Sequence, residues 1–349
     1  KGIVKSYMSH HQGMILASIN NFINDGILIK RFHRDPQMKC GELLLHERIP
    51  YTPIVSNERE NLQQVEIKRR RVEIWEKRVY SREDLQTIKC HLLSSSNYTV
   101  MITNRGEGFS KEGNIFINRW RRDYLINPYG QFIYIKDLKN NKCWSTTYAP
   151  SYVEPDSYEV EFHLYKAVFN RRDGNIETRM DIYLLPEEAG EIRRVRLIND
   201  SDEEALLESI SYFEVLGEDI NSDLAHPAFS NLFISTEALE EQEGLLAYRR
   251  KRDDRKEDSW ILHFVRVFEE GVERYQYETS RLNFIGRGNS VINPIALTKG
   301  LTNTTGVVLD PIMSIGKKIK VPPKGKIDIY YITALTNTKS QAMDILKKY

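Results

Sequence analysis

The chain of 349 residues is long enough for one large domain or two ordinary ones, and its composition, 40% hydrophobic and 28% charged, is that of a globular protein. Its formal net charge of +1 argues against a dedicated nucleic-acid-binding protein, which normally carries a clear basic excess. No apolar run reaches the roughly 18 to 20 residues that cross a bilayer, and the first residues lack the layout of a signal peptide, so we expect a soluble segment without a membrane span.

The first 50 residues carry a helical pattern. Apolar residues recur at three- and four-residue steps over residues 8–23, and "NDG" at 24–26 ends this helix. A second helix is expected in "DPQMKCGELLLHER" (35–48), where Asp35 can cap the free N–H groups and Pro36 takes the tolerated first position. Because the chain runs directly into a helix without an initiator Met, we interpret it as a segment of a longer polypeptide.

The period of the sequence changes after residue 70. Residues 51–70 are polar, show no steady period and are predicted to be a linker. Beyond them, segments rich in β-branched and aromatic residues alternate with turn signals. Since no long helical pattern separates these segments, we predict antiparallel sheets packed face to face over 71–335. The last residues, 336–349, begin another helix with Ser340 as a candidate cap. The predicted strands are 98–103, 131–138, 143–148, 175–185, 191–199, 209–215, 231–236, 260–268 and 326–335.

The three cysteines, Cys40, Cys90 and Cys143, are odd in number, far apart and outside any Cys-x-x-Cys pattern. This usage favours reduced thiols and a cytoplasmic location.

Two adjacent histidines stand in the first predicted helix. His10 and His11 lie about 100° apart around a helix, whereas two metal ligands on one helical face need a spacing of three or four residues. A metal site is therefore not expected. Two alternatives remain open for His10, His11 and Gln12: they pack against another helix, or they line a site for a polar ligand.

The densest polar and aromatic stretch is "TNRGEGFSKEGNIFINRWRRDY" (103–124). Its glycines follow a predicted strand, but no Gly-Lys-Ser/Thr opens a helix behind them, so a phosphate-binding loop is not expected. Sugar recognition uses aromatic faces for C–H groups and charged groups for hydroxyls. In the alternative interpretation, the tryptophan belongs to the core and the arginines pair with surface acids. The candidate sugar-binding residues are Phe109, Arg119, Trp120, Arg121 and Asp123.

A further candidate is His226, which precedes Pro227 in an extended turn ahead of a predicted strand. We expect this turn to shape a neighbouring pocket. Neither Ser nor Cys stands in a nucleophile-elbow context near it, and the spacing of the carboxylates selects no pair for glycoside chemistry. The sequence therefore predicts no catalytic residue, no metal and no cofactor.

Several long motifs resemble the cyclic β-1,2-glucan synthases. They are "SYMSHHQGMILASINNF" (6–22), "RFHRDPQMKCGELLLHERIP" (31–50), "LLSSSNYTVMITNRGEGFS" (92–110), "INRWRRD" (117–123), "AHPAFSNLF" (225–233), "YETSRLNFIGRGN" (277–289) and "TTGVVLDPIMS" (304–314). The resemblance implies that 1–50 is the helical tail of a glycoamylase-like (α/α) barrel and 51–70 a linker. It further implies that 71–335 is a β-supersandwich of the galactose-mutarotase type, and that 336–349 starts a helical linker to an (α/α)6 barrel.

The same resemblance implies a function. The sandwich would be a mostly non-catalytic, carbohydrate-binding part of a glucan-synthesising protein, without a complete active site of its own. Its expected partners are a β-glucan or another oligosaccharide, the remaining domains of the polypeptide and, as one option, a second copy. Its expected location is the cytoplasmic face of a bacterial inner membrane. Two alternatives stay open: the N-terminal region of a β-1,2-oligoglucan or cellobiose-type phosphorylase, and a mutarotase-like domain that processes a sugar end with a His/Glu pair.

Overall fold

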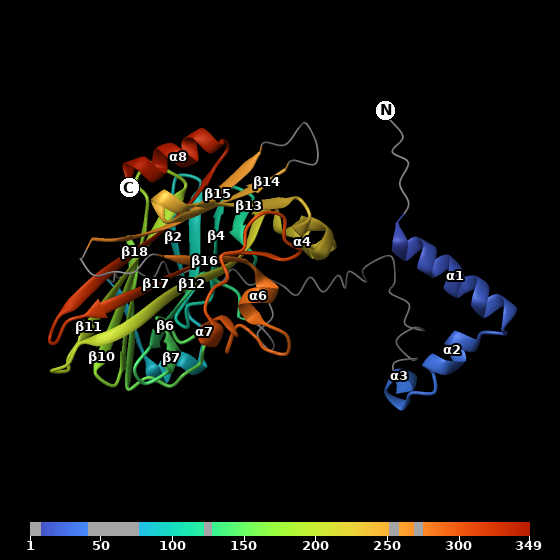
Figure 1. The fold of residues 1–349 in the computed structure, drawn as a ribbon, viewed down its shortest axis with the longest axis horizontal. Helices are drawn as coiled ribbons and strands as arrows, with labels where there is room; N and C mark the ends of the chain where they lie inside the picture. The colour runs from blue at the N-terminus through green and yellow to red at the C-terminus, as the bar shows by residue number, and fades with distance from the viewer. Residues whose placement is uncertain (1–7, 41–76, 122–127, 251–257, 269–274) are drawn as a thin grey trace, which may run out of the picture. The chain divides into compact units, whose positions relative to one another are not determined.

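The computed structural model describes residues 8–40, 77–121, 128–250, 258–268 and 275–349. The chain divides into two units, Lys1–Val72 and Glu73–Tyr349, which are described separately (Figure 1). The predicted linker, 51–70, lies outside the described residues. Within the described ranges, no helix is both long and apolar enough to cross a membrane.

The described part of the first unit is helical, as predicted. It contains α1 (Ser9–Ile23), α2 (Ile27–Phe32) and α3 (Pro36–Cys40). The helix α1 ends at the predicted turn, where Asp25 and Gly26 both adopt positive φ values, of 50° and 72°. Large apolar side chains of α1, such as Phe22 at 90% exposure, are not covered by any described residue of this unit.

The second unit is built on two antiparallel sheets. The first sheet has nine strands in the order β1-β8-β9-β10-β11-β18-β15-β14-β13. The long strand β18 joins its two halves, because it pairs with β11 on one side and β15 on the other. The strands are β1 (Lys77–Ser81), β8 (Ser157–His163), β9 (Lys166–Asp173), β10 (Ile176–Leu184), β11 (Gly190–Asn199), β18 (Lys326–Thr336), β15 (Ser259–Val267), β14 (Gly244–Arg249) and β13 (Ile234–Leu239).

The second sheet is organised around the 14-residue strand β12 (Ala205–Glu218), which pairs with β17, β5 and β6. Its order is β16-β17-β12-β5-β4-β3-β2, with β7 added through β6. The other strands are β16 (Gln276–Ser280), β17 (Pro311–Val321), β5 (Ile115–Asn118), β4 (Gly108–Glu112), β3 (Tyr98–Thr103), β2 (Cys90–Ser95), β6 (Phe132–Asp137) and β7 (Lys142–Ser145).

The main apolar core lies between these two sheets. Alternate residues of β11, such as Val195 and Leu197, face alternate residues of β12, such as Leu207 and Phe213, and all are at most 1% exposed. This period of two is what places one face of each strand in the core. The predicted fold class, a mainly β protein with a large antiparallel sandwich after a short helical segment, is therefore confirmed.

Short helices cover the outer faces of both sheets. On the second sheet, α6 (Arg281–Ile285) and α7 (Ala296–Lys299) bury a smaller cluster that includes Tyr212 and Phe284. On the first sheet, α8 (Lys339–Lys348) packs on β15 and β18 (Figure 1). The predicted cap of this last helix was wrong by two residues: Thr338, not Ser340, accepts the backbone N–H of Gln341, at 3.2 Å. The remaining short elements are α4 (Ile220–Ala225), α5 (Pro227–Asn231) and the 3-10 turns η2 (Arg82–Gln86) and η3 (Glu240–Gln242).

Two leucines form a matched test of this core. Leu207 on β12 is fully buried, whereas Leu164 is 92% exposed. We expect Leu207→Ala to lower the free energy of unfolding by about 2–5 kcal/mol, because a close-packed core leaves a cavity. Leu164→Ala should change it by less than about 0.5 kcal/mol. Urea denaturation followed by circular dichroism measures both, and equal losses would contradict the central position of β12.

Candidate functional site

A buried group of charged side chains lies where β5, β12 and the α4–α5 turn meet. Arg119, directly after β5, is 5% exposed and forms a two-pronged contact with Asp223 of α4 through Nε (3.0 Å) and Nη2 (2.8 Å). Its Nη1 lies 3.0 Å from Glu214 Oε2 on β12, and its Nη2 lies 2.7 Å from Asn231 Oδ1 on α5. Because a buried charge must be paired, these contacts fix α4 and α5 against the sheet.

The same group continues toward solvent. Arg281 Nε lies 2.8 Å from Glu214 Oε1, and Arg121 Nη2 lies 3.4 Å from Asp223. Asn231 Nδ2 donates to Asp310 at 2.8 Å. Burial and then repulsion by Glu214 raise the pKa of Asp310 above its usual range. We call these residues the arginine cluster: Arg119, Arg121, Glu214, Asp223, Asn231, Arg281 and Asp310. Its three guanidinium groups and three carboxylates balance in charge. Arg119, Glu214 and Asp223 at its centre bind one another, whereas Nε of Arg121 is buried without a hydrogen-bond partner among the described residues.

Several of the predicted sugar-binding residues meet at this place. Arg119 and Arg121 both contact Asp223, and the exposed His226 follows three residues later, between α4 and α5. Phe109 and Trp120 lie side by side, with ring centroids 5.7 Å apart. The sugar-binding role of these residues stays a prediction.

The other predicted residues are placed elsewhere or not described. Asp123 lies outside the described residues. His10, His11 and Gln12 belong to α1 of the first unit, where all three are exposed. The backbone of His226 (φ −150°, ψ 75°) lies outside the extended region that was expected. The strand predicted at 231–236 is observed as β13, Ile234–Leu239, after a short helix that was not predicted. Pro227 begins this helix, α5, because its fixed φ suits the first position of a helix.

A serine and a histidine meet inside the sandwich, which the sequence did not indicate. His263 Nε2 lies 2.8 Å from Ser211 Oγ, and His263 Nδ1 lies 2.9 Å from Thr333 Oγ1. Both His263 and Ser211 are 2% exposed. The histidine has no carboxylate to orient it among the residues that the structure describes, and burial, reinforced by Arg193, lowers its pKa to about 3. The pair is therefore a structural contact between the sheets and not a nucleophile with its base.

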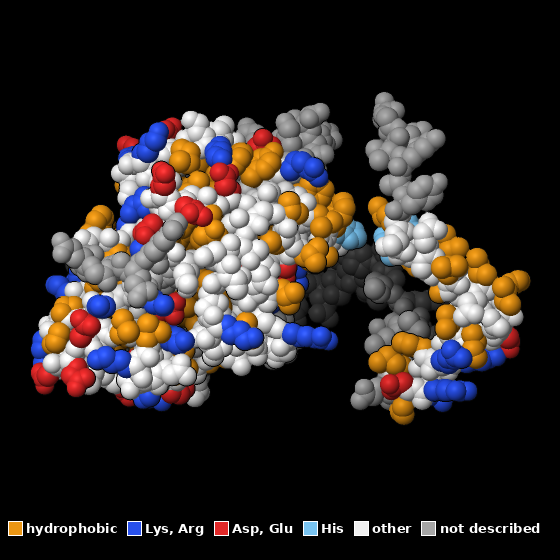
Figure 2. Space-filling view, viewed as in Figure 1, with side chains coloured by type: hydrophobic (Ala, Val, Ile, Leu, Met, Phe, Trp, Pro, Cys, Tyr) orange, Lys and Arg blue, Asp and Glu red, His pale blue; other side chains and the backbone are white. Residues whose placement is uncertain are grey.

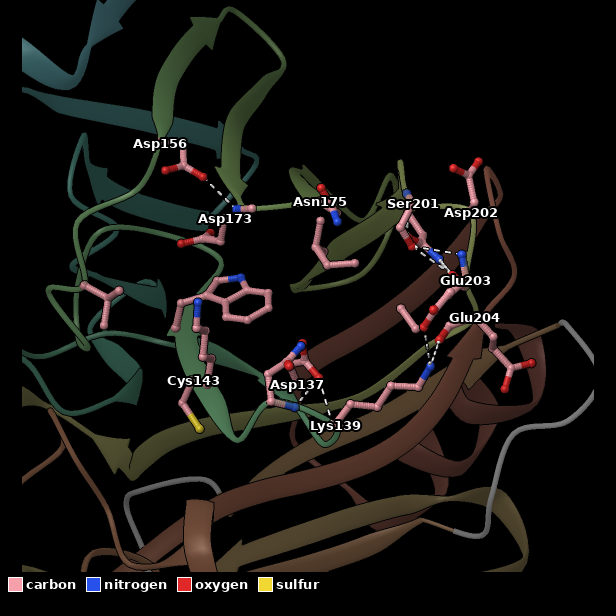
Figure 3. A pocket seen from close by; sticks show the side chains of 18 of the residues that line it. Asp137, Lys139, Cys143, Asp156, Asp173, Asn175, Ser201, Asp202, Glu203 and Glu204 are labelled. Atoms are coloured by element: carbon pink, nitrogen blue, oxygen red, sulfur yellow. Dashed lines mark hydrogen bonds and ion pairs between the residues drawn. The ribbon is translucent and has the colours of Figure 1, made fainter.

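One cavity lined by described residues lies among the hairpin loops of the sandwich and has a volume of about 980 Å³; we call it the larger cavity (Figure 3). Three of its acidic side chains are engaged in contacts within the protein. Asp137 accepts the N–H of Lys139 at 2.9 Å, and Asp156 accepts the N–H of Gly174 at 2.6 Å. Asp173 pairs with Arg171 at 2.6 Å. No group of three metal-ligating side chains occurs within the described part of the chain. The other acidic residues that line this cavity are Glu154, Asp202, Glu203 and Glu204, and the side chains of Asp202 and Glu203 are 93% and 86% exposed.

A second cavity, of about 750 Å³, lies beside two tyrosines. We call it the tyrosine cavity; its lining residues are Arg82, Glu83, Leu85, Gln86, Arg105, Tyr148, Tyr152 and Glu154. The only hint in the sequence was the pair of tyrosines around the prolines of "YAPSYVEP" (148–155), which lacks any regular period.

Comparison with known proteins places the sandwich in context. The model of the glycosyl hydrolase 94 supersandwich domain matches residues 76–349. Cyclic beta-(1,2)-glucan synthase NdvB of Rhizobium meliloti (strain 1021) is 32% identical over 340 residues, which are 95% of this chain. The chain spans 12% of the length of this curated relative. These matches confirm the predicted supersandwich and the resemblance carried by the sequence motifs.

Solved structures are more distant. A galactose mutarotase related enzyme from Lactobacillus acidophilus has a TM-score of 0.38 and 11% identity, over 72% of this chain and 99% of that one. A polysaccharide lyase has a TM-score of 0.38 and 11% identity, over 75% of this chain and 34% of that one.

The arginine cluster can be tested through Asp223, whose side chain is fully buried. We expect Asp223→Asn to lower the free energy of unfolding by about 3–5 kcal/mol, because Arg119 keeps its charge and loses its main partner. Asp202→Asn is the matched control, since Asp202 is 93% exposed and should change stability by less than about 0.5 kcal/mol. Chemical denaturation at neutral pH measures both; a loss below about 1 kcal/mol for Asp223→Asn would contradict the argument.

His263 predicts a pH dependence of stability. Its pKa is about 3 in the folded protein, against the ordinary histidine value of 6.5 in the unfolded chain. Below pH 6.5 the unfolded chain therefore binds a proton that the folded chain does not, so stability falls as the pH falls toward 3. Between about pH 7.5 and pH 5 this histidine should remove about 2 kcal/mol. Chemical denaturation at the two pH values should show a smaller difference in the free energy of unfolding for His263→Gln than for the unmodified chain. An unchanged difference would show that His263 is not the source of the pH dependence.

Proposed function

The chain belongs, through residues 76–349, to the glycosyl hydrolase 94 supersandwich family, and from this premise we propose that it is a non-catalytic part of a glucan-processing protein. In this proposal the sandwich organises neighbouring domains of a protein of the cyclic β-1,2-glucan synthase type and contacts its glucan. The reaction itself takes place in other parts of that protein.

The observation that carries the proposal is that the buried polar and charged side chains of the candidate sites are bound to one another within the protein. The carboxylates of the arginine cluster are bound by guanidinium groups, and three of those that line the larger cavity are engaged in contacts within the protein. Ser211 and His263 are sealed between the sheets. General acid–base chemistry needs a group that can reach substrate with its proton available. Glu214 and Asp223 at the centre of the arginine cluster and the Ser211–His263 contact do not provide one, which supports a binding and organising role.

The surface around the arginine cluster supports contact with another domain. Large apolar side chains stand exposed on α4, α5 and α6 and directly after α5: Leu224 is 55%, Phe229 47%, Leu232 51% and Leu282 67% exposed. Figure 2 shows hydrophobic side chains gathered near α4. Exposed apolar patches of this kind are typical of interaction surfaces. We propose that a further domain of the same polypeptide covers this surface, since NdvB is far longer than this chain.

The mutarotase-like alternative receives less support. A His/Glu pair does occur on β8, where His163 Nε2 lies 2.8 Å from Glu161 Oε2. However, Lys77 Nζ also lies 2.6 Å from Glu161, and this contact lowers the pKa of the glutamate. A carboxylate stabilised in its charged form is a weaker base. In our proposal the sandwich therefore does not process sugar ends, and it serves its protein at the cytoplasmic face of the inner membrane.

The proposal is tested by activity and binding together. Incubated with linear β-1,2-glucan and inorganic phosphate, the chain should release no glucose 1-phosphate in a coupled enzymatic assay. Calorimetric titration with linear β-1,2-glucan should show binding, with cellobiose as the comparison. Release of glucose 1-phosphate would overturn the non-catalytic role, and the absence of any glucan binding would overturn the contact with glucan.

A further inference from the structure

The tyrosine cavity has features that neither the arginine cluster nor the larger cavity shares. It lies between the turn η2, the loop that follows β3 and the loop that follows β7. Its volume of about 750 Å³ falls in the range of small-molecule sites, roughly 300–1,000 Å³. Two aromatic rings, two guanidinium groups and two carboxylates meet in it.

The two rings are held in a fixed arrangement. The ring centroids of Tyr148 and Tyr152 are 5.5 Å apart, at an interplanar angle of 74°. Tyr148 donates its hydroxyl to Glu154 at 2.9 Å, and Tyr152 donates to the buried Glu107 at 3.4 Å. Both rings are only partly buried. They therefore present rigid apolar faces, which the C–H groups of a pyranose ring can cover.

The backbone at this place adopts an unusual conformation. Tyr152 has φ +51°, in the left-handed region that bulky residues rarely adopt. Nearby, Gly106 has φ +96°, and a Cβ added there would lie 2.3 Å from Thr147. The loop after β3 is thus packed closely against the segment before Tyr148. Strained residues held by their surroundings concentrate at ligand sites, and this one positions an aromatic ring.

Polar groups in the cavity remain available. Arg105 donates through Nε to Leu85 O at 2.7 Å, and its two terminal nitrogens have no hydrogen-bond partner among the described residues. Gln86 at the rim is exposed. Arg82 and Arg105 balance Glu83 and Glu154 in charge, so the cavity favours a neutral ligand with many hydroxyl groups over an anion.

We propose that the tyrosine cavity is a binding site for a neutral oligosaccharide, with sugar rings against Tyr148 and Tyr152 and hydroxyl groups on Arg105 and Gln86. The inference rests on the proposed contact with glucan and names where that contact is made. It also gives the loop after β3 a role: Gly106 allows the close packing that forms one wall of the site.

The test compares three variants by calorimetric titration with a short linear β-1,2-glucan. Tyr152→Asn removes the ring, and asparagine tolerates the left-handed backbone, so the fold should be kept. We expect at least a tenfold loss of affinity for Tyr152→Asn and a similar loss for Arg105→Gln. Tyr165→Ala is the matched control, because Tyr165 is a 65% exposed tyrosine that does not line the cavity, and it should bind as the unmodified chain does. Thermal unfolding checks that each variant is folded.

The outcomes separate the site from the function. Loss of binding in the folded Tyr152→Asn variant, with Tyr165→Ala unchanged, supports the site. Unchanged affinity in Tyr152→Asn overturns the site and leaves the proposed contact with glucan standing elsewhere on the sandwich. No binding by the unmodified chain overturns that contact and the site with it. If the chain binds inorganic phosphate and not glucan, and Arg105→Gln loses this binding, the proposal that the ligand is neutral is overturned.

Discussion

The structure of the sandwich depends on burying both faces of one strand. Twelve consecutive residues of β12, from Leu207 to Glu218, are buried. One face joins the core between the sheets, and the other lies under α6, α7 and the arginine cluster. A strand covered on both sides cannot follow the usual alternation of apolar and solvated residues. The covering layer must therefore supply a partner for each polar group on its outer face.

Two glutamates on that outer face show how this requirement is met. Glu214 is held by Arg119 and Arg281, and Glu218 is held by Arg249 of β14. Each arginine comes from a different part of the fold. The pairs therefore connect β12 to its neighbours and also neutralise the charges of its two glutamates. Removing one member of such a pair leaves the other charged group buried without a partner. The charges that look reactive in the sequence are thus chiefly a means of assembling the sandwich.

Local patterns in the sequence predicted some of the elements but not their partners. The period of two located β11 within a residue, and "NDG" located the end of α1. The helices α4 to α7 were missed because they have four to six residues and depend on packing and not on propensity. At the arginine cluster, Arg119 was singled out, whereas Asp223 follows 104 residues later and was not. The tyrosine cavity was missed because it depends on backbone angles and loop contacts that no periodicity reports.

The position of β18 in the first sheet has a consequence for biosynthesis. This strand, formed near the end of the described chain, is the element through which β8–β11 and β13–β15 become one sheet. Until the ribosome has delivered it, the edges of β11 and β15 lack their partner, and unpaired edges invite association with other chains. The nascent sandwich therefore depends on its last strand for closure, and chaperone binding would be most useful in the interval before residues 326–336 emerge.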